Sequence, residues 1–196
     1  MPRWEPNARE RLVTAAMELF EARGYEQTTV ADIAKRAGLT ERTFFNCFPD
    51  KREVLFYGAE KLETFIAESV AEVPATTPVM QVVAQALAAV ARASDERPRF
   101  ATFARRRHTL IQQHAELQER ELKKLASVSA AMAVALRRRD VPAAEARLAA
   151  EVGIAIFKVA FERCMSSSKR RKLAVHLHET LDEFAAFDVA QDSLST

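Results

Sequence analysis

Cysteine is scarce in this sequence, and the scarcity argues against two classes of protein. The chain has 196 residues and 2 cysteines, Cys47 and Cys164, which lie far apart. A disulfide framework needs several cysteines, and a thiolate zinc site needs closely spaced pairs such as Cys-x-x-Cys. Neither pattern is present, so we expect a reduced, cytoplasmic protein with no metal and no cofactor.

Long hydrophobic runs are also missing. No window approaches the roughly 18 uninterrupted apolar residues of a transmembrane helix, and the opening residues, MPRWEPNARE, are too polar for a signal peptide. We therefore expect no membrane partner.

Glycine and most aromatic residues are few, which favours helices over strands. The chain has 4 Gly, 2 Tyr and 1 Trp, while Ala, Leu, Arg and Glu are abundant. The abundant residues have high helix propensities, whereas β-branched and aromatic residues favour strands. We predict an all-α protein of one or two small domains, long enough to bury a core without disulfides.

Neither sign of charge is in large excess. Lys plus Arg number 29 and Asp plus Glu number 27, so the formal net charge is +2. A nucleic-acid footprint is a local patch rather than a sum over the chain, so this balance does not decide for or against DNA binding.

Residues 1–50 carry the start and stop signals of three helices. Two short helices joined by a tight turn and braced by a longer preceding helix predict a helix-turn-helix domain, with an unrelated small helical hairpin as the alternative. The signals, in chain order, are a start after Pro6-Asn7, a stop at Gly24, a capping-box pattern Thr29-x-x-Asp32, a stop at Gly38, a cap at Thr40 and a break at Pro49-Asp50.

The rest of the chain, residues 51–196, also has helical spacing of its apolar residues. Gly58 and Gly153 fall inside helices on this pattern. The predicted helices cover about 51–73, 78–93, 99–114, a long segment ending near 139, 143–165 and 169–187.

Four segments of the first 55 residues together resemble the N-terminal domain of the TetR (tetracycline-repressor-like) regulators. The remaining residues are similar to that family only in being helical and of family length. The segments are Phe20-Glu21-Ala22-Arg23-Gly24-Tyr25, Thr28-Thr29-Val30-Ala31-Asp32-Ile33-Ala34, Ala37-Gly38-Leu39 and Thr43-Phe44-Phe45-x-x-Phe48-Pro49-x-Lys51.

The resemblance implies a homodimeric repressor. Residues 1–50 would form the helix-turn-helix DNA-binding domain, and residues 51–196 a helical effector-binding and dimerisation domain. The dimer would bind a (pseudo)palindromic operator in double-stranded DNA, and a small-molecule effector would release it. A non-repressing activator and a helical interaction module are the alternatives.

The family pattern also implies which residues meet DNA, and their chemistry fits. Arg42 can donate to guanine O6 and N7, Asn46 can pair with adenine, and the methyl group of Thr43 can touch thymine. Thr29 and Lys51 occupy helix starts, where N–H groups attract phosphate. The full set expected at the DNA is Thr28, Thr29, Thr40, Glu41, Arg42, Thr43, Phe45, Asn46 and Lys51.

Three positions of this segment need separate interpretation. Family members usually have Tyr at Phe45 and often His at Cys47, so we expect only apolar contacts from these two residues. Glu41 could accept from cytosine N4, or it could favour the helix N-terminus and repel phosphate at wrong sequences.

The recognition segment is more basic than the chain as a whole. Residues 35–52 hold five basic side chains against two acidic ones, a net charge of +3 (5 − 2). DNA binding should therefore depend on salt, because each neutralised phosphate releases counterion. The cations are Lys35, Arg36, Arg42, Lys51 and Arg52.

Two helices near the C-terminus carry apolar stripes that predict a dimer interface. The helix over about 143–165 is apolar on more than one side, so it must be covered on more than one side. We expect it to form an isologous four-helix interface with the last helix and their symmetry mates, the alternative being that both lie in a monomer core. The predicted interface residues are Val152, Ile156, Val159, Leu177, Leu181 and Phe184.

The helix from residue 99 suggests an effector pocket. Arg107 and His108 lie one turn from both ends of its apolar face, and an inward Arg107 would need an anionic partner, such as the headgroup of a largely apolar effector. Alternatively, Arg107 reaches solvent or pairs with a nearby Glu, and His108 is a core histidine. The predicted pocket residues are Phe103, Arg107, His108, Ile111, Met132 and Phe157.

Enzyme signatures are weak, so we expect no catalytic residues. His178 and Asp182 supply only two ligands of a metal site. Ser166-x-x-Lys169 matches a penicillin-binding-protein nucleophile motif, but its partner motifs are missing.

Overall fold

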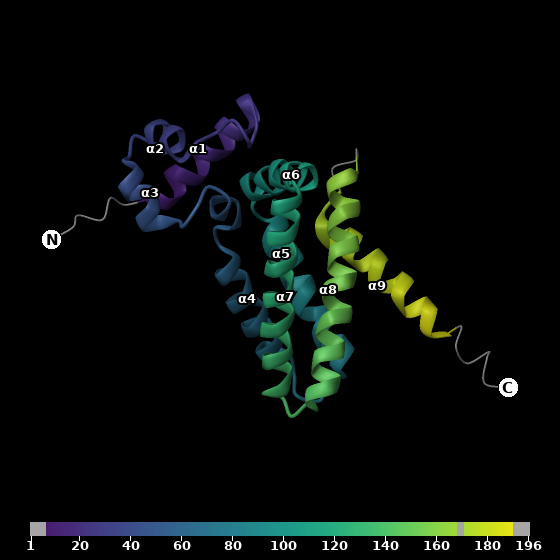
Figure 1. The fold of residues 1–196 in the computed structure, drawn as a ribbon. Helices are drawn as coiled ribbons and strands as arrows, with labels where there is room; N and C mark the ends of the chain where they lie inside the picture. The colour runs from purple at the N-terminus through teal and green to yellow at the C-terminus, as the bar shows by residue number, and fades with distance from the viewer. Residues whose placement is uncertain (1–6, 168–170, 190–196) are drawn as a thin grey trace. The chain divides into compact units, whose positions relative to one another are not determined.

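A computed structural model describes residues 7–167 and 171–189, without the side chains of residues 98–100 and 188–189. Within these ranges the chain forms helices and no strand, which confirms the all-α prediction (Figure 1). The helices are α1 (Ala8–Arg23), α2 (Val30–Arg36), α3 (Glu41–Cys47), the 3₁₀ helix η1 (Glu53–Phe56), α4 (Ala59–Glu72), α5 (Val79–Asp95), α6 (Pro98–Gln113), α7 (Ala115–Arg137), α8 (Ala143–Ser166) and α9 (Leu173–Val189).

The continuous helix predicted over 51–73 is interrupted. The carboxylate of Asp50 accepts hydrogen bonds from the backbone N–H groups of Arg52 (2.8 Å) and Glu53 (3.1 Å), which starts the short η1. Gly58 then has φ 91°, a left-handed conformation that a helix cannot include, and α4 begins at the next residue. Helical spacing of apolar residues does not reveal such a break, because both halves keep their period.

Contacts divide the chain into two compact units. The first comprises residues 1–59 together with Arg106–Glu121, and the second comprises Glu60–Arg105 and Leu122–Thr196. Residues 51–59 and 106–121 therefore pack with the N-terminal helices, whereas the sequence placed them in the larger domain. The division passes through α6 and through the first turns of α7.

The first unit has its own apolar core. Helix α1 packs against α2, α3 and η1. Fully buried side chains from each of these elements and from the loops meet there, among them Leu12, Phe20, Tyr25, Ile33, Phe44 and Leu55.

The second unit is a helical bundle in which α5, α8 and α9 pack on one another. Its core includes Met132 and Leu136 of α7 and Gly153 of α8, all buried. The carboxylate of Asp95, at the end of α5, accepts hydrogen bonds from the first two N–H groups of α9 at 2.9 and 3.0 Å, and so fixes where α9 begins. Among the described residues, no helix has the length and apolar character needed to cross a membrane.

Candidate nucleic-acid interface

Helix α2 begins with the capping box that the sequence predicts. The hydroxyl of Thr29 accepts a hydrogen bond from the N–H of Asp32 (3.2 Å), and the carboxylate of Asp32 accepts one from the N–H of Thr29 (3.1 Å). The Thr29 hydroxyl also donates to this carboxylate at 2.7 Å. These hydrogen bonds from Thr29 hold the pKa of Asp32 below its ordinary value. Three hydrogen bonds between Thr29 and Asp32 therefore hold the start of α2.

Helix α3 begins at Thr40, whose hydroxyl accepts a hydrogen bond from the N–H of Thr43 at 3.1 Å. The two threonine hydroxyls also lie 2.9 Å apart and share a hydrogen bond. Thr40 thus caps the helix, and its polar atoms are engaged within α3.

The turn between α2 and α3 is held by a residue that the sequence analysis did not identify. Gly38 has φ 65°, a conformation that glycine adopts without the cost of a Cβ. Arg11 reaches from α1 and donates to the carbonyl of Ala37 through Nε (3.1 Å) and Nη2 (2.6 Å). The three helices are therefore tied together at the turn itself. Nothing in the local pattern around Arg11 signals this role, because its partner is 26 residues away.

One face of α3 is open to solvent. Glu41, Arg42, Phe45 and Asn46 are exposed, with Phe45 at 55%, while Phe44 is buried beneath them. Their positions, i, i+1, i+4 and i+5, lie on one side of a helix. These are four of the residues that the sequence predicts at the DNA, and the structure brings them together on one surface.

Most of the basic charge of residues 35–52 is neutralised or used locally. Arg36 forms an ion pair with Glu18 (2.7 Å), and Arg52 forms one with Asp50 (3.2 Å). In the described part of the chain, neither Lys35 nor Arg42 forms a hydrogen bond or an ion pair with another side chain. The charge available to an external anion is therefore concentrated on these two residues.

The ammonium group of Lys51 faces the loop between α1 and α2. It donates hydrogen bonds to the carbonyls of Tyr25 (2.9 Å), Thr28 (3.2 Å) and Glu26 (3.4 Å). It also lies 4.3 Å from the centre of the Tyr25 ring, a cation–π contact. The hydroxyl of Thr28 is directed inward too, since it donates to the carbonyl of Gly24 at 2.8 Å and the residue is buried.

Tyr25 anchors the same loop from its other side. Its ring is 1% exposed and lies 4.9 Å from the ring of His114, in the corner between α6 and α7. Burial, followed by a hydrogen bond to Glu116, raises the pKa of the phenol above its ordinary value. The loop is therefore fixed by a buried aromatic side chain as well as by Lys51.

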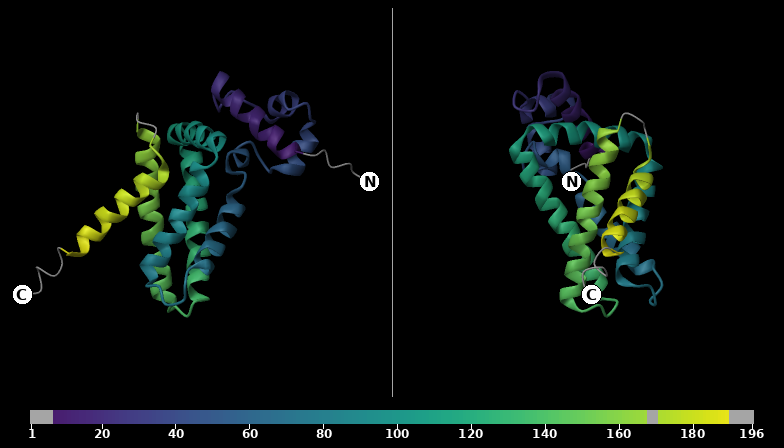
Figure 2. Two further views of the ribbon diagram at one scale, coloured as in Figure 1. Left: turned by 180° about the vertical axis from the view of Figure 1, so that it is seen from behind. Right: turned by 90° about the vertical axis from the view of Figure 1, so that its right-hand side faces the viewer.

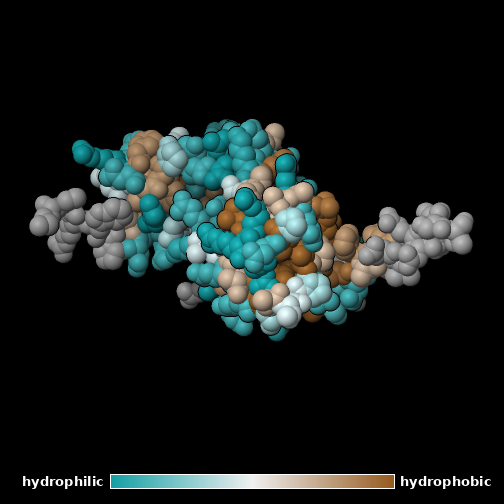
Figure 3. Space-filling view, turned by 90° about the horizontal axis from the view of Figure 1, so that it is seen from below, coloured by the Kyte–Doolittle hydropathy of each residue, from teal (hydrophilic) through white to brown (hydrophobic). Residues whose placement is uncertain are grey.

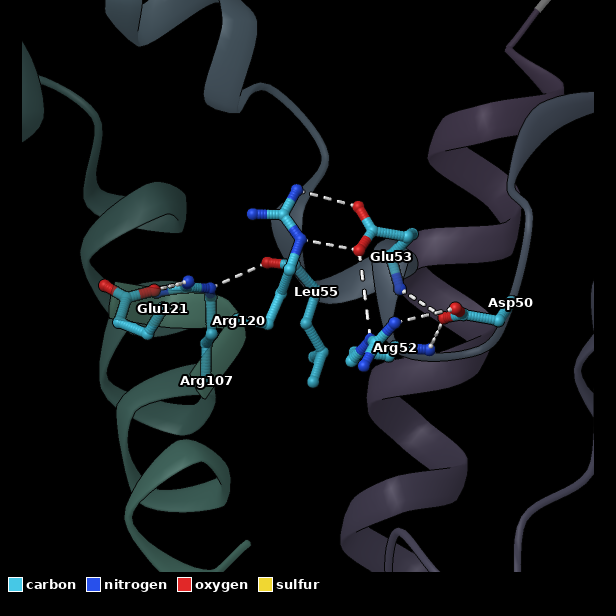
Figure 4. Close-up of polar contacts among 7 residues, drawn as sticks. All are labelled: Asp50, Arg52, Glu53, Leu55, Arg107, Arg120 and Glu121. Atoms are coloured by element: carbon cyan, nitrogen blue, oxygen red, sulfur yellow. Dashed lines mark hydrogen bonds and ion pairs between the residues drawn. The ribbon is translucent and has the colours of Figure 1, made fainter. Parts of the chain in front are cut away.

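Arg107, which the sequence predicts in an effector pocket, lies in the first unit. Its Nε donates to the carbonyl of Leu55 at 2.7 Å, and its Nη2 forms an ion pair with Glu121 (Figure 4). Its guanidinium lies 4.7 Å from the ring of Phe56. This matches the alternative in which Arg107 pairs with a nearby glutamate. The group is 8% exposed, so its charge is balanced inside the protein.

A second arginine also contacts η1. Arg120 forms a two-pronged ion pair with Glu53, at 2.6 and 2.8 Å (Figure 4). Its guanidinium lies 4.6 Å from the ring of Phe56. The hydrogen bond to Glu53 raises the pKa of Arg120 above its ordinary value. Arg107 and Arg120 together fasten residues 106–121 to η1.

The six predicted pocket residues are divided between the units. Arg107, His108 and Ile111 belong to the first unit, and Ile111 is buried there. Phe103, Met132 and Phe157 belong to the second. Met132 is fully buried in the core, and Phe157 is partly buried and stacks on Phe161 with the ring centres 6.3 Å apart. A pocket formed by all six stays a prediction.

The predicted dimer residues differ in exposure. Ile156 and Leu177 are buried in the core of their own unit, and Val152 and Leu181 are partly buried. Val159 and Phe184 are each 40% exposed, and further large apolar side chains on α8 and α9 are more exposed, namely Leu148 at 66% and Phe187 at 73%.

The C-terminal part of α9 has little cover from its own unit. Every residue from 182 to 187 is exposed, on all sides of the helix. Figure 2 shows this part of α9 leading away from α8, and Figure 3 shows hydrophobic surface gathered where α9 leaves the bundle. Phe184 and Phe187 therefore form exposed apolar surface at this end of α9.

The weak enzyme signatures gain nothing from the structure. His178 and Asp182 form an exposed pair at 3.5 Å, and the described residues contain no group of three or more possible metal-ligating side chains. Lys169, the second residue of the Ser166-x-x-Lys169 pattern, lies outside the described residues.

Comparisons with known proteins agree with this geometry. Residues 12–57 match the family described as bacterial regulatory proteins, tetR family. The HTH-type transcriptional regulator TcmR of Streptomyces glaucescens is 50% identical over 46 residues, which are 24% of this chain and 20% of TcmR. The chain thus matches about a fifth of the length of that relative.

Solved structures of regulators resemble nearly the whole chain. FadR of Thermus thermophilus, a repressor in complex with lauroyl-CoA, has a TM-score of 0.54 and 22% identity, with 89% of this chain and 91% of FadR covered. SmeT of Stenotrophomonas maltophilia, in complex with triclosan, has a TM-score of 0.61 and 22% identity, with 90% of each chain covered. At these identities the likeness shows the fold. The helix-turn-helix segment, residues 12–57, thus matches the tetR family of bacterial regulatory proteins, and the chain shares the fold of these solved regulators.

Proposed function

We propose that the protein is a repressor that binds operator DNA through α3. The exposed face formed by Glu41, Arg42, Phe45 and Asn46 is the observation that carries the proposal. Arg42 is the central residue, because its five donors are free of partners among the described residues and can meet guanine O6 and N7. Since operator DNA lies in the bacterial cytoplasm, the proposed role places the protein there.

The neighbouring residues take different parts in this proposal. Asn46 would read adenine and the Thr43 methyl would touch thymine, while Phe45 would add apolar contact. Thr40 and Thr29 have their hydroxyls in helix caps, so they would meet the phosphate backbone chiefly through the helix starts that they form.

Selection of binding sites from a random-sequence duplex library tests the proposal. We expect the purified protein to enrich a two-fold symmetric sequence. Arg42→Ala should then weaken binding to that sequence by about 1–3 kcal/mol and change random duplex binding much less. Arg36→Ala is the matched control, since Arg36 is exposed, is paired with Glu18 and lies outside α3. Failure to enrich any sequence would refute the repressor proposal, and equal losses on both duplexes for Arg42→Ala would refute base reading by Arg42.

We also propose that the protein acts as a homodimer through α8 and α9. The exposed apolar residues Leu148, Val159, Phe184 and Phe187 support this assignment. Of the residues expected at the interface, Ile156 and Leu177 would support it from the core of their own subunit, and Val152 and Leu181 would lie at its edge. A stable monomer in sedimentation at micromolar concentration would contradict the proposal.

The effector site is proposed in the second unit, near Phe103, Met132 and Phe157, and the effector would be small and largely apolar. The lauroyl chain of the lauroyl-CoA in the FadR structure and the triclosan in the SmeT structure support an apolar ligand. The hypothesis that Arg107 binds an anionic group of the effector is no longer supported, because Glu121 already balances the charge of Arg107. Lauroyl-CoA and triclosan are therefore the probes, and release of the selected DNA by either would support the assignment. If neither probe releases the DNA, both compounds are excluded as effectors.

A further inference from the structure

The Lys51 side chain has no hydrogen-bond donor left for a phosphate. A lysine ammonium carries three N–H donors and no acceptor. The three carbonyls that it faces, those of Tyr25, Glu26 and Thr28, all belong to one short loop, at 2.9, 3.4 and 3.2 Å. Hydrogen bonds with a charged donor are stronger than neutral ones, so a phosphate would have to compete with a group already satisfied.

The loop depends on these contacts for its shape. Between α1 and α2, the backbone makes few hydrogen bonds of its own, such as the one from the N–H of Thr28 to the carbonyl of Tyr25 at 3.3 Å. The carbonyls that meet Lys51 converge on one point, where their partial negative charges would repel one another without a cation. The Tyr25 ring below the ammonium adds a further favourable contact at 4.3 Å.

The loop leads directly into the DNA-binding helices. Thr29, which caps α2, follows Thr28 without a break, and α2 leads through Gly38 to α3. A change in the loop therefore alters how the start of α2 is held. We propose that Lys51 is a positioning residue for DNA binding: its ammonium closes the loop between α1 and α2 and does not bind phosphate. This inference rests on the proposed DNA-binding function.

The salt dependence of DNA binding distinguishes a positioning role of Lys51 from direct binding of phosphate by Lys51. Each phosphate contact that a cation makes contributes about 0.9 to the slope of log Kobs against log salt. We expect Lys51→Met, measured by fluorescence anisotropy on a random-sequence duplex, to bind several-fold more weakly with an unchanged slope. A slope reduced by about 0.9 for each lost contact would show that Lys51 binds phosphate and would overturn the proposal.

Hydrogen exchange in the absence of DNA provides a readout that a phosphate ligand would not change. Lys51→Met should speed exchange of the Thr28 and Thr29 amides by roughly tenfold, since hydrogen bonds to a charged group are lost. Lys35→Met is the matched control, because Lys35 is exposed and forms no hydrogen bond or ion pair within the described part of the chain, and it should leave these amides as in the wild type. Wild-type protection of the loop in Lys51→Met would overturn the proposal.

A second variant keeps the test decisive if Lys51→Met does not fold. Lys51→Arg retains the positive charge but replaces three donors on one nitrogen with a planar fork, which cannot meet the three carbonyls in the same way. We expect faster exchange of Thr28 and Thr29 with an unchanged salt slope, and wild-type protection would count against the proposal. If the wild-type protein bound no DNA, the repressor function would fail, whereas the exchange result would still decide what Lys51 does to the loop.

Discussion

Gly153 of α8 packs closely against α5, and we predict that Gly153→Ala destabilises the protein. A Cβ at this position would lie 2.4 Å from Cγ1 of Val83 on α5, with Leu87 Cδ1 at 3.5 Å and Met132 Sδ at 3.6 Å. Non-bonded carbons prefer about 3.5–4.0 Å, so α5 and α8 must separate by about 1 Å or Val83 must change rotamer. Val83 is fully buried, and a β-branched side chain has few rotamers available.

Two opposing terms set the size of the effect. Overpacking a core costs about 1–3 kcal/mol. Alanine is better than glycine in a helix by about 0.8–1.0 kcal/mol. We therefore expect a net loss of about 0–2 kcal/mol in the free energy of unfolding, where an unobstructed site would show a gain of about 1 kcal/mol.

Urea unfolding at one fixed protein concentration measures this effect, because association makes apparent stability concentration-dependent. Ala130→Gly, at an exposed position within α7, calibrates the helix-propensity term in the same protein. The decisive comparison is Gly153→Ala in a Val83→Ala background, where the obstructing Cγ1 is absent. There the substitution should stabilise by up to about 1 kcal/mol. If Gly153→Ala stabilised the wild type to the same extent, the reasoning from close approach would be refuted.

Three further predictions concern the first unit and the dimer. Arg11→Met should lower the free energy of unfolding by about 1–2 kcal/mol and weaken DNA binding, since it removes the donors to Ala37; urea unfolding and anisotropy check this, and unchanged values contradict it. Arg120→Met should cost about 1–2 kcal/mol in urea unfolding because it removes the two-pronged partner of the partly buried Glu53 carboxylate and leaves only the longer contact with Arg52 at 3.9 Å, and a loss no larger than that of the exposed-surface control Arg92→Met would disprove it. Phe187→Glu should shift the protein towards monomer in sedimentation, and an unchanged dimer would remove Phe187 from the interface.

Local signals in the sequence were sufficient for the helix-turn-helix elements. The capping box of Thr29 and Asp32 and the helix stop at Gly38 involve residues only a few positions apart, so their hydrogen bonds and backbone angles follow from neighbouring residue types. The face of α3 could likewise be predicted, because four exposed positions follow directly from helical geometry. These parts of the candidate site needed no tertiary information.

Side chains with distant partners could not be placed in the same way. Arg107 lies on a helix whose apolar face suggested a pocket, but its partners include a carbonyl 52 positions earlier. Lys51 occupies a helix-start position typical of phosphate contact, yet its acceptors lie 23 to 26 residues away. Long, flexible cations can reach several partners, and only the packed structure decides among them.

Two glycines show the same limit of prediction from the sequence. Gly58 and Gly153 both lie within runs of helical spacing, but Gly58 ends one element with φ 91° and Gly153 lies in the middle of α8 against Val83. The sequence period is the same in both cases. What distinguishes them is the backbone conformation at one and the neighbouring helix at the other.

The attachment of residues 106–121 to the first unit limits how the proposed DNA-binding unit could be transplanted. A chimaera cut after residue 59 would leave Tyr25 without His114 and Glu116, and Phe56 without the two guanidiniums that cover it. The chain passes from one unit to the other at three points. A transplanted unit would therefore have to combine residues 1–59 with residues 106–121. Exchange of operator specificity between relatives is then simpler through the surface of α3 alone, which none of these crossings touches.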